Sequence, residues 1–384
     1  MKKTLILFLL VITSCSLFAN FNYELDLINL KPLHKEYLAD RSRPTNSIDY
    51  LYITDEGVPT FLHQHESILP FTSGGWDPSY KVKNNYLRIN LGETFSFARN
   101  TLTFDHWLSP LSFDFSFQIH YRNLITGDIS EEFGFDSVFF YGYTASIANK
   151  VSFRVGSTHY CSHIGDAIYD WIPKNIPIGD IDHLLKKYRR SDTLVFGVSV
   201  EPYQWLRVYG ELNYIPEKIH SGVQPWGFMP SWAEVQDGSP QIKSNHPKEY
   251  KGRIINAGLE LNYTIFKEMG KTTFAYNIYL YEEGKIDYPN DPPSGNVKED
   301  IDIDEWVYNP DKPWEVEHSF LISQELSKNV AMELKIHQGR FPINKFFNFR
   351  GTSVSIGFAI NLQGKANLAD TKDNYYGLRF QSEE

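Results

Sequence analysis

Residues 111–123 read LSFDFSFQIHYRN, with an apolar or aromatic side chain at every second position. Because successive side chains of a β-strand point to opposite faces, Phe113, Phe115 and Phe117 share one face in such a strand, and polar residues share the other. A single strand of this kind is compatible with a soluble sandwich as well as with a membrane barrel. The stretch therefore predicts a strand with one apolar face, and the rest of the chain must decide between these two folds.

The same alternation recurs along most of the chain, for example over residues 206–214, 255–263 and 353–361. We expect strands at about 48–56, 86–98, 111–123, 134–147, 150–160, 193–203, 205–217, 252–265, 272–284, 315–325, 330–341 and 352–362. A tilted strand needs only about 9–11 residues to cross a bilayer, and most of these segments reach that length. The predicted fold class is all-β, a transmembrane antiparallel β-barrel of about 12 strands.

The first residues look like an export signal. Lysines at positions 2 and 3 precede an apolar run over 5–18, and a small residue, Ala19, follows it. This pattern is typical of a secretory signal peptide, here 1–19, cleaved after Ala19. A looser alternative is cleavage before Cys15, which would leave that residue as a lipid anchor. An exported barrel is expected in the bacterial outer membrane.

The remaining chain divides by composition and by the lengths of its connections. Residues 20–47 are polar and irregular and are expected to form a periplasmic N-terminal extension, with a plug inside the barrel as the alternative. The barrel is expected over 48–362 and a C-terminal tail over 363–384. Tight connections near residues 149, 203, 269 and 328 alternate with long ones at 124–133, 161–191, 218–250, 285–313 and 342–351. Because periplasmic turns of such barrels are short, this alternation and an even strand count place both ends of the barrel in the periplasm.

Composition agrees with a membrane barrel. The 24 Tyr and 27 Phe suit aromatic girdles at the two membrane interfaces. A net charge of -10 gives no support for nucleic-acid binding. The expected partners are outer-membrane lipids, with a basic group at Lys186, Lys187, Arg189 and Arg190 either solvated in a loop or in contact with lipopolysaccharide phosphates.

The chemistry-bearing residues gather in the fifth predicted strand. Val151, Phe153 and Val155 begin a lipid-facing stripe, and the same parity continues through Ser157, His159, Cys161 and His163. If no bulge intervenes, two imidazoles and a thiol share the outer face near the external end of the strand, and Tyr160 and Ser162 point into the lumen. Ser162 shares the face of the histidines only if the strand twists or bulges at its rim. Once the signal is removed, Cys161 is the only thiol, which excludes a disulfide framework but not a reactive cysteine.

A first resemblance is carried by His159 followed by Cys161-Ser162-His163-Ile164-Gly165-Asp166-Ala167. This run resembles the Ser-Ser-His-x-Gly-Asp-Glu motif of DUF1207, an uncharacterised family of exported proteins. The stretch 32–44 resembles a second family segment of Pro-Leu and Ala-Asp-Pro-Arg type. Here Cys161 replaces the first serine and Ala167 replaces the glutamate. The resemblance implies location and fold, because that family has no established activity.

A second, looser resemblance is to the outer-membrane phospholipases, twelve-stranded barrels whose His-x-Ser-Asn-Gly motif faces lipid at the outer leaflet. It implies a serine nucleophile, a histidine base, a third polar group and a calcium ion that holds the oxyanion. The matching candidates in this chain are Ser162 or Ser157 as nucleophile, His159 or His163 as base, and Asp166 or Asp170 as the orienting group. A divalent-metal site from His159, His163 and Asp166, for calcium or another ion, is a further candidate. The plainer alternative is that both histidines bind loop backbone at the rim and that Gly165-Asp166 forms a turn.

Two classes of function follow. The first is a non-enzymatic barrel, namely a narrow channel, a transport accessory or a surface structural protein. The second is a lipid-active hydrolase acting on phospholipid or lipopolysaccharide acyl esters at the external end of the fifth strand. Predicted lumen residues of both signs can either lock together as ion pairs or line a narrow channel; they include Arg122, Arg154, Arg207, Glu211 and Glu260.

Overall fold

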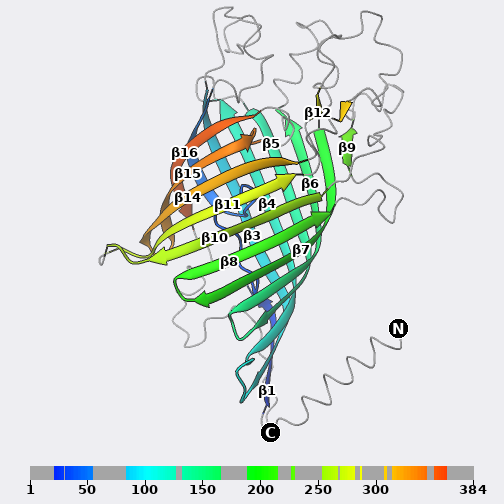
Figure 1. The fold of residues 1–384 in the computed structure, drawn as a ribbon, viewed down its shortest axis with the longest axis vertical. Coiled ribbons are helices and arrows are strands. Elements are labelled where there is room, and N and C mark those ends of the chain that lie inside the picture. Colours follow the sequence, from blue (N-terminus) through cyan, green and yellow to red (C-terminus); the bar gives the residue numbers. More distant parts are fainter. Residues whose placement is uncertain are drawn as a thin grey trace, which may run out of the picture.

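The computed structural model describes residues 21–29, 31–54, 84–126, 132–165, 188–214, 226–229, 253–266, 269–281, 286–287, 307–308, 314–343 and 350–360. Within these residues, twelve antiparallel strands form one closed ring (Figure 1). The order around the ring is β3-β2-β16-β15-β14-β11-β10-β8-β7-β6-β5-β4, and pairing of β3 with β4 closes it. The predicted barrel is confirmed.

The ring strands begin and end within a few residues of the predicted ranges, apart from longer β3 and β7. They are β2 (Asn46–Ile53), β3 (Asn85–Phe104), β4 (Leu111–Thr126), β5 (Glu132–Ile147), β6 (Val151–Ile164), β7 (Tyr188–Tyr203), β8 (Leu206–Tyr214), β10 (Arg253–Tyr263), β11 (Thr272–Tyr281), β14 (Glu315–Ser327), β15 (Val330–Arg340) and β16 (Arg350–Ile360). Outside the ring, β1 (Phe21–Asn29) pairs with β3, β9 (Trp226–Met229) pairs with β7, and β12 (Ile286–Asp287) pairs with β13 (Val307–Tyr308).

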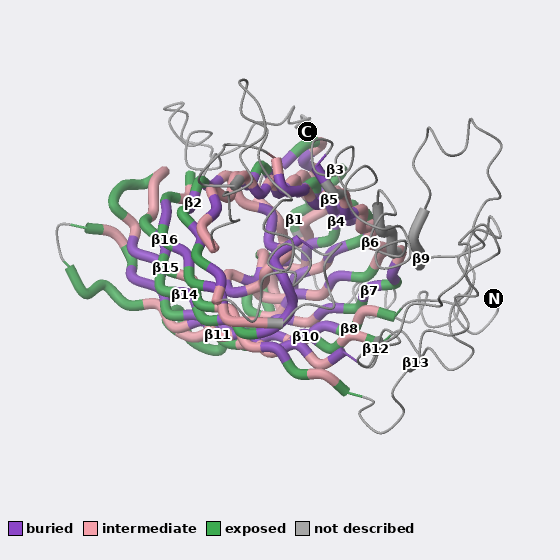
Figure 2. Tube along the Cα trace, turned by 90° about the horizontal axis from the view of Figure 1, so that it is seen from above, coloured by how far each residue is buried: buried purple, intermediate pink, exposed green. Residues whose placement is uncertain are grey.

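The two faces of each strand differ in chemistry as the alternation predicts. On β4, Phe113 is 51% exposed and Phe115 37% exposed, whereas Asp114 and Ser116 are buried in the lumen. Figure 2 shows the same alternation of exposed and buried positions on neighbouring strands. An apolar outer surface of this extent is unfavourable in water, and a closed ring leaves no unpaired strand edge. The barrel is therefore built to sit in a bilayer. No helix among the described residues is long and apolar enough to cross a membrane.

One end of the barrel carries its tightest connections, and we call it the tight-turn end. The three-residue connection of β5 to β6 has φ of 53° at both Ala148 and Asn149, the left-handed geometry that matches the twist of a hairpin. Asn46, where β2 begins, pairs with Ile360, where β16 ends, so both ends of the barrel chain also lie there. Assignment of this end to the periplasm stays a prediction.

Residues 31–45 contact the inner wall of the barrel, and we call this segment the plug. The amide of Leu38 donates to Glu260 at 2.8 Å, and the guanidinium of Arg43 donates to both oxygens of Glu333 at 2.9 and 3.0 Å. Residues 31–45 therefore lie against the inner wall, as in the plug alternative, whereas the assignment of 20–47 to a periplasmic extension stays a prediction. The physical reason is that the polar plug supplies partners for charges on the inner wall. The signal over 1–19 and the tail over 363–384 lie outside the described residues.

Several arginines of the inner wall form ion pairs with lumen carboxylates. Arg154 pairs with Glu211, Arg207 with Glu260 at 3.2 Å and Arg99 with Asp114 at 2.9 Å. Two cavities lined by described residues of the interior measure about 60 and 120 Å³, enough for small groups of water molecules. The described interior is therefore largely filled.

Candidate functional site

The candidate site lies on β6, between β5 and β7. The register of β6 with β7 runs without a break from Val151 opposite Val200 to His163 opposite Tyr188. Side-chain parity is therefore kept along the whole strand. As predicted, Ser157, His159, Cys161 and His163 share the outward parity, and Ser162 is fully buried on the lumen side.

Three side chains form a continuous hydrogen-bonded chain on the outer face. Nε2 of His159 lies 2.8 Å from Sγ of Cys161, two residues along the same strand. Nδ1 of His159 lies 2.6 Å from Oδ1 of Asp192, its cross-strand partner on β7. The side chains of His159 and Asp192 are 29% and 14% exposed, so the pair is partly shielded. We call Cys161, His159 and Asp192 the thiol triad.

The contacts within the thiol triad determine which ring nitrogen of His159 carries the proton. An ionised carboxylate can only accept, so Nδ1 of His159 is the donor to Asp192. In the neutral ring Nε2 is then the acceptor, and it faces the sulfur of Cys161. A nucleophile beside a base that a third group orients is the arrangement required for covalent catalysis. The thiol triad can therefore deliver a thiolate to an electrophilic carbonyl carbon.

The outer surface between the thiol triad and the tight-turn end of the barrel is apolar. One rung toward the tight-turn end, Ser157 lies between Tyr141 and Leu194, which are 49% and 54% exposed. The next rung places Tyr143 and Phe196 on either side of Val155. The triad thus stands where an apolar outer wall gives way to polar residues, at the end of β6 farther from the tight turn.

Ser162 is separated from the thiol triad by the sheet itself. Its hydroxyl donates to Asp136, and the hydroxyl of Tyr160 donates to the other oxygen of the same carboxylate at 2.6 Å. These two residues flank Cys161 in sequence but face the lumen. The prediction of Ser162 as nucleophile is corrected, because an unbroken strand cannot bring positions 159 and 162 to one face.

The other predicted site residues have separate environments. The hydroxyl of Ser157 donates to the carbonyl of Thr193 at 3.0 Å. The ring of His163 stacks on Phe135 with centroids 4.4 Å apart. Asp166 and Asp170 lie outside the described residues. Among the described residues no group of three or more His, Cys, Asp or Glu is arranged to hold a metal ion, and the divalent-metal site with Asp166 stays a prediction.

Two members of the thiol triad, Cys161 and Asp192, were not among the predicted catalytic residues. The predicted stripe already placed Cys161 beside His159, and the spacing His-x-Cys is the signal that identifies the thiol as the partner. Asp192 immediately precedes the predicted strand 193–203, but its position opposite His159 depends on inter-strand register. Register of distant segments is not encoded in local alternation, so nothing local marked Asp192.

No protein-family model matches the chain, so the resemblance to DUF1207 stays a prediction. No curated protein matches it either. Solved structures that match include outer membrane phospholipase A from Escherichia coli, with 12% identity and a TM-score of 0.44 over 83% of this chain and 92% of that one. An active-site mutant of the Escherichia coli phospholipase matches with 12% identity and a TM-score of 0.45 over 85% and 92% of the two chains. The NanC porin matches with 10% identity and a TM-score of 0.38 over 83% of this chain and all of that one. At these values the likeness concerns barrel architecture alone: the chain resembles outer-membrane barrels, some of them enzymes and others channels.

Proposed function

We propose that this protein is an outer-membrane enzyme that cleaves lipid acyl esters with a cysteine nucleophile. Cys161 is the nucleophile, His159 the general base and Asp192 the residue that orients the base. The observation that carries the proposal is the hydrogen-bonded chain from sulfur to imidazole to carboxylate, with spacings of 2.8 and 2.6 Å.

The position of the thiol triad supports a membrane lipid as the substrate. The triad faces outward from the barrel, so a solute passing through the lumen would not meet it. An acyl chain can lie along the apolar wall formed by Tyr141, Leu194 and Phe196, which are each about half exposed. That placement brings the ester of a membrane lipid to the level of Cys161. Phospholipids and lipopolysaccharide acyl esters both fit this description.

The reaction has two steps, transfer of the acyl group to Cys161 and hydrolysis of the thioester. Nε2 of His159 takes the thiol proton while the sulfur of Cys161 attacks the ester carbonyl, and the resulting imidazolium returns that proton to the departing alkoxide as the C–O bond breaks. A thioester on Cys161 remains. His159 then takes a proton from water, the hydroxide attacks the thioester, and the fatty acid leaves as the thiol is restored. Asp192 accepts the Nδ1–H bond throughout and stabilises the imidazolium.

The interior supports this reading over a channel. A plug crosses the lumen, and wall arginines are engaged by carboxylates, as for Arg207 and Glu260 at 3.2 Å. A conducting path would need those pairs to separate. The filled interior instead suits a barrel whose chemistry lies on its outer wall.

The test is fatty-acid release from mixed phospholipid–detergent micelles by refolded full-length protein, with and without calcium. Cys161→Ala and His159→Ala are expected to reduce turnover by at least about 10³-fold, the scale of losing a nucleophile or its base. Ser162→Ala is the matched control, since its hydroxyl lies in the lumen, and it should retain activity. If Cys161→Ala released fatty acid as fast as wild type, another residue would have to be the nucleophile. If the wild-type protein released fatty acid from neither phospholipid nor lipopolysaccharide, the proposed enzymatic activity would be refuted.

A further inference from the structure

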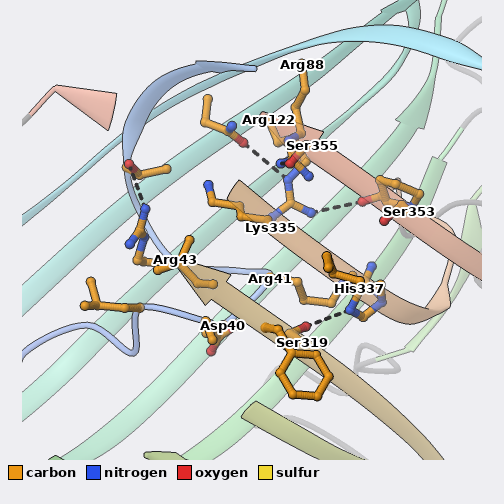
Figure 3. Close-up of a pocket in the computed structure, with 18 residues that line it drawn as sticks. Asp40, Arg41, Arg43, Arg88, Arg122, Ser319, Lys335, His337, Ser353 and Ser355 are labelled. Carbon is orange, nitrogen blue, oxygen red and sulfur yellow. Dashed lines mark hydrogen bonds between the residues drawn. The ribbon is translucent and has the colours of Figure 1, made fainter. Parts of the chain in front are cut away.

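A lumenal cavity of about 60 Å³ lies between the plug and the inner wall formed by β3, β4, β14, β15 and β16 (Figure 3). Its lining is rich in cationic and imidazole side chains, and we call it the basic cavity. These side chains are Arg41, Arg43, Arg88, Arg122, Lys335 and His337. One carboxylate, Asp40, lines it with them.

On one side of the basic cavity, three cations share two carboxylates. Arg88 donates to both oxygens of Asp49 at 2.9 and 3.0 Å, and Arg43 donates to both oxygens of Glu333 at 2.9 and 3.0 Å. Nζ of Lys335 lies 2.9 Å from Glu333 and 3.7 Å from Asp49. This group therefore carries one positive charge more than its acidic partners.

On the other side, two guanidiniums are poorly matched by carboxylates. Arg41 and Arg122 donate to the backbone carbonyls of residues 341 and 342, at 3.2 and 2.9 Å. Their nearest carboxylate oxygens, on Glu317 and Asp136, lie at 3.5 and 3.6 Å. Nη1 of Arg41, the atom that lies 3.5 Å from Oε2 of Glu317, makes no hydrogen bond of good geometry although the side chain is only 10% exposed. A buried donor held this far from its acceptor is incompletely satisfied, so an acceptor that enters the cavity can form stronger hydrogen bonds there.

Neutral donors complete the lining. Ser353 and Ser355 line the same space. Ser319 and His337 also line it, but their side chains are hydrogen-bonded to each other at 2.7 Å, and Nε2 of His337 lies 3.5 Å from Glu317. Ser355 accepts from Arg88 at 2.8 Å, which leaves its own hydroxyl proton to donate. Arginine forks with added hydroxyls are the donor set that recognises the oxygens of phosphate-like anions.

We propose that the basic cavity binds one small tetrahedral oxyanion of the phosphate class. Its volume of about 60 Å³ corresponds to roughly four water molecules at the ~10–15 Å³ each requires, which is the scale of a five-atom anion. Arg41 from the plug and Arg122 from β4 approach it from opposite elements, so the anion ties the plug to the barrel wall. This site is independent of the thiol triad.

The experiment is titration calorimetry of inorganic phosphate into refolded full-length protein in a neutral detergent without lipid. Wild type is expected to bind one phosphate per chain. Arg41→Gln and Arg122→Gln should each weaken binding at least about tenfold, since each removes a charge-assisted donor. Arg99→Gln is the matched control, because this guanidinium is equally buried in the lumen but is engaged by Asp114 at 2.9 Å and does not line the cavity. It should bind as wild type does.

Because Arg122 lies on a barrel strand, its variant can fail to fold, and heat-modifiable gel mobility checks this. Arg41 lies on the plug, so Arg41→Gln decides the question if Arg122→Gln does not fold. Absence of phosphate binding by wild type would overturn the proposal. Equal weakening by Arg99→Gln would overturn it as well, since the effect would then reflect net lumen charge and not the basic cavity.

Discussion

Replacement of Asp192 by alanine tests the thiol triad at the residue that the tertiary structure added to it. Oδ1 of Asp192 accepts from Nδ1 of His159 at 2.6 Å, in a partly shielded position where the carboxylate is 14% exposed. In the proposed mechanism Asp192 acts through His159 as a positioning residue. Its loss leaves the imidazole free to rotate and to place its proton on the nitrogen that faces Cys161.

The size of the effect follows from the bond that is lost. A hydrogen bond to a charged group contributes about 1.5–3 kcal/mol, and each ~1.4 kcal/mol in the barrier is a factor of ten in rate. Asp192→Ala should therefore lower turnover by about 10–150-fold, with larger losses if the wrong tautomer dominates. The decrease should be smaller than that of His159→Ala, which removes the base itself.

Two independent assays test this prediction. Fatty-acid release from mixed micelles measures turnover, and the rate of Cys161 alkylation by iodoacetamide measures thiol activation without any assumption about substrate. Both should fall in Asp192→Ala. Asp105→Ala, an exposed carboxylate in the β3–β4 turn, is the control and should change neither. The orienting role is refuted if Asp192→Ala matches wild type in both the rate of Cys161 alkylation and the rate of fatty-acid release while His159→Ala does not.

Four further outcomes are expected. Cys161→Ser should retain slow lipid cleavage that N-ethylmaleimide no longer inhibits, since a hydroxyl replaces the thiol; inhibition at the wild-type level would contradict this. Arg43→Ala should lower the free energy of unfolding by about 3 kcal/mol, measured as a urea midpoint on gels, because it takes the bidentate partner from buried Glu333. Deletion of 31–45 should produce conductance in planar bilayers that wild type lacks. If neither protein conducted, the plug would not be what closes the lumen. Burial, with Arg154 and Arg207 nearby, holds the pKa of plug residue His34 well below its ordinary 6.5, so the ring stays neutral in the fold but is protonated when unfolded. The free energy of unfolding should therefore fall as the pH drops below about 6.5, and His34→Gln should reduce that slope in urea titrations.

Local alternation was sufficient to predict the barrel wall. Phe113 and Phe115 face outward and Asp114 and Ser116 inward, because a strand has a side-chain period of two whatever its neighbours are. The same period placed His159 and Cys161 together on the outer face and Ser162 on the inner one. The phospholipase-like motif favoured Ser162 as nucleophile, but the parity of the strand places this side chain in the lumen, away from His159.

The pattern of residues along the chain was thus enough to predict the fold class, the strand positions to within a few residues and the face on which each side chain of β6 lies. The assembled barrel was needed to place Asp192 against His159 and residues 31–45 in the lumen. The reason is that the period of a strand is a property of the local backbone, which every segment carries with it. Register between β6 and β7, and the charge pairs that hold the plug, arise only when segments far apart in the chain are brought into one closed ring.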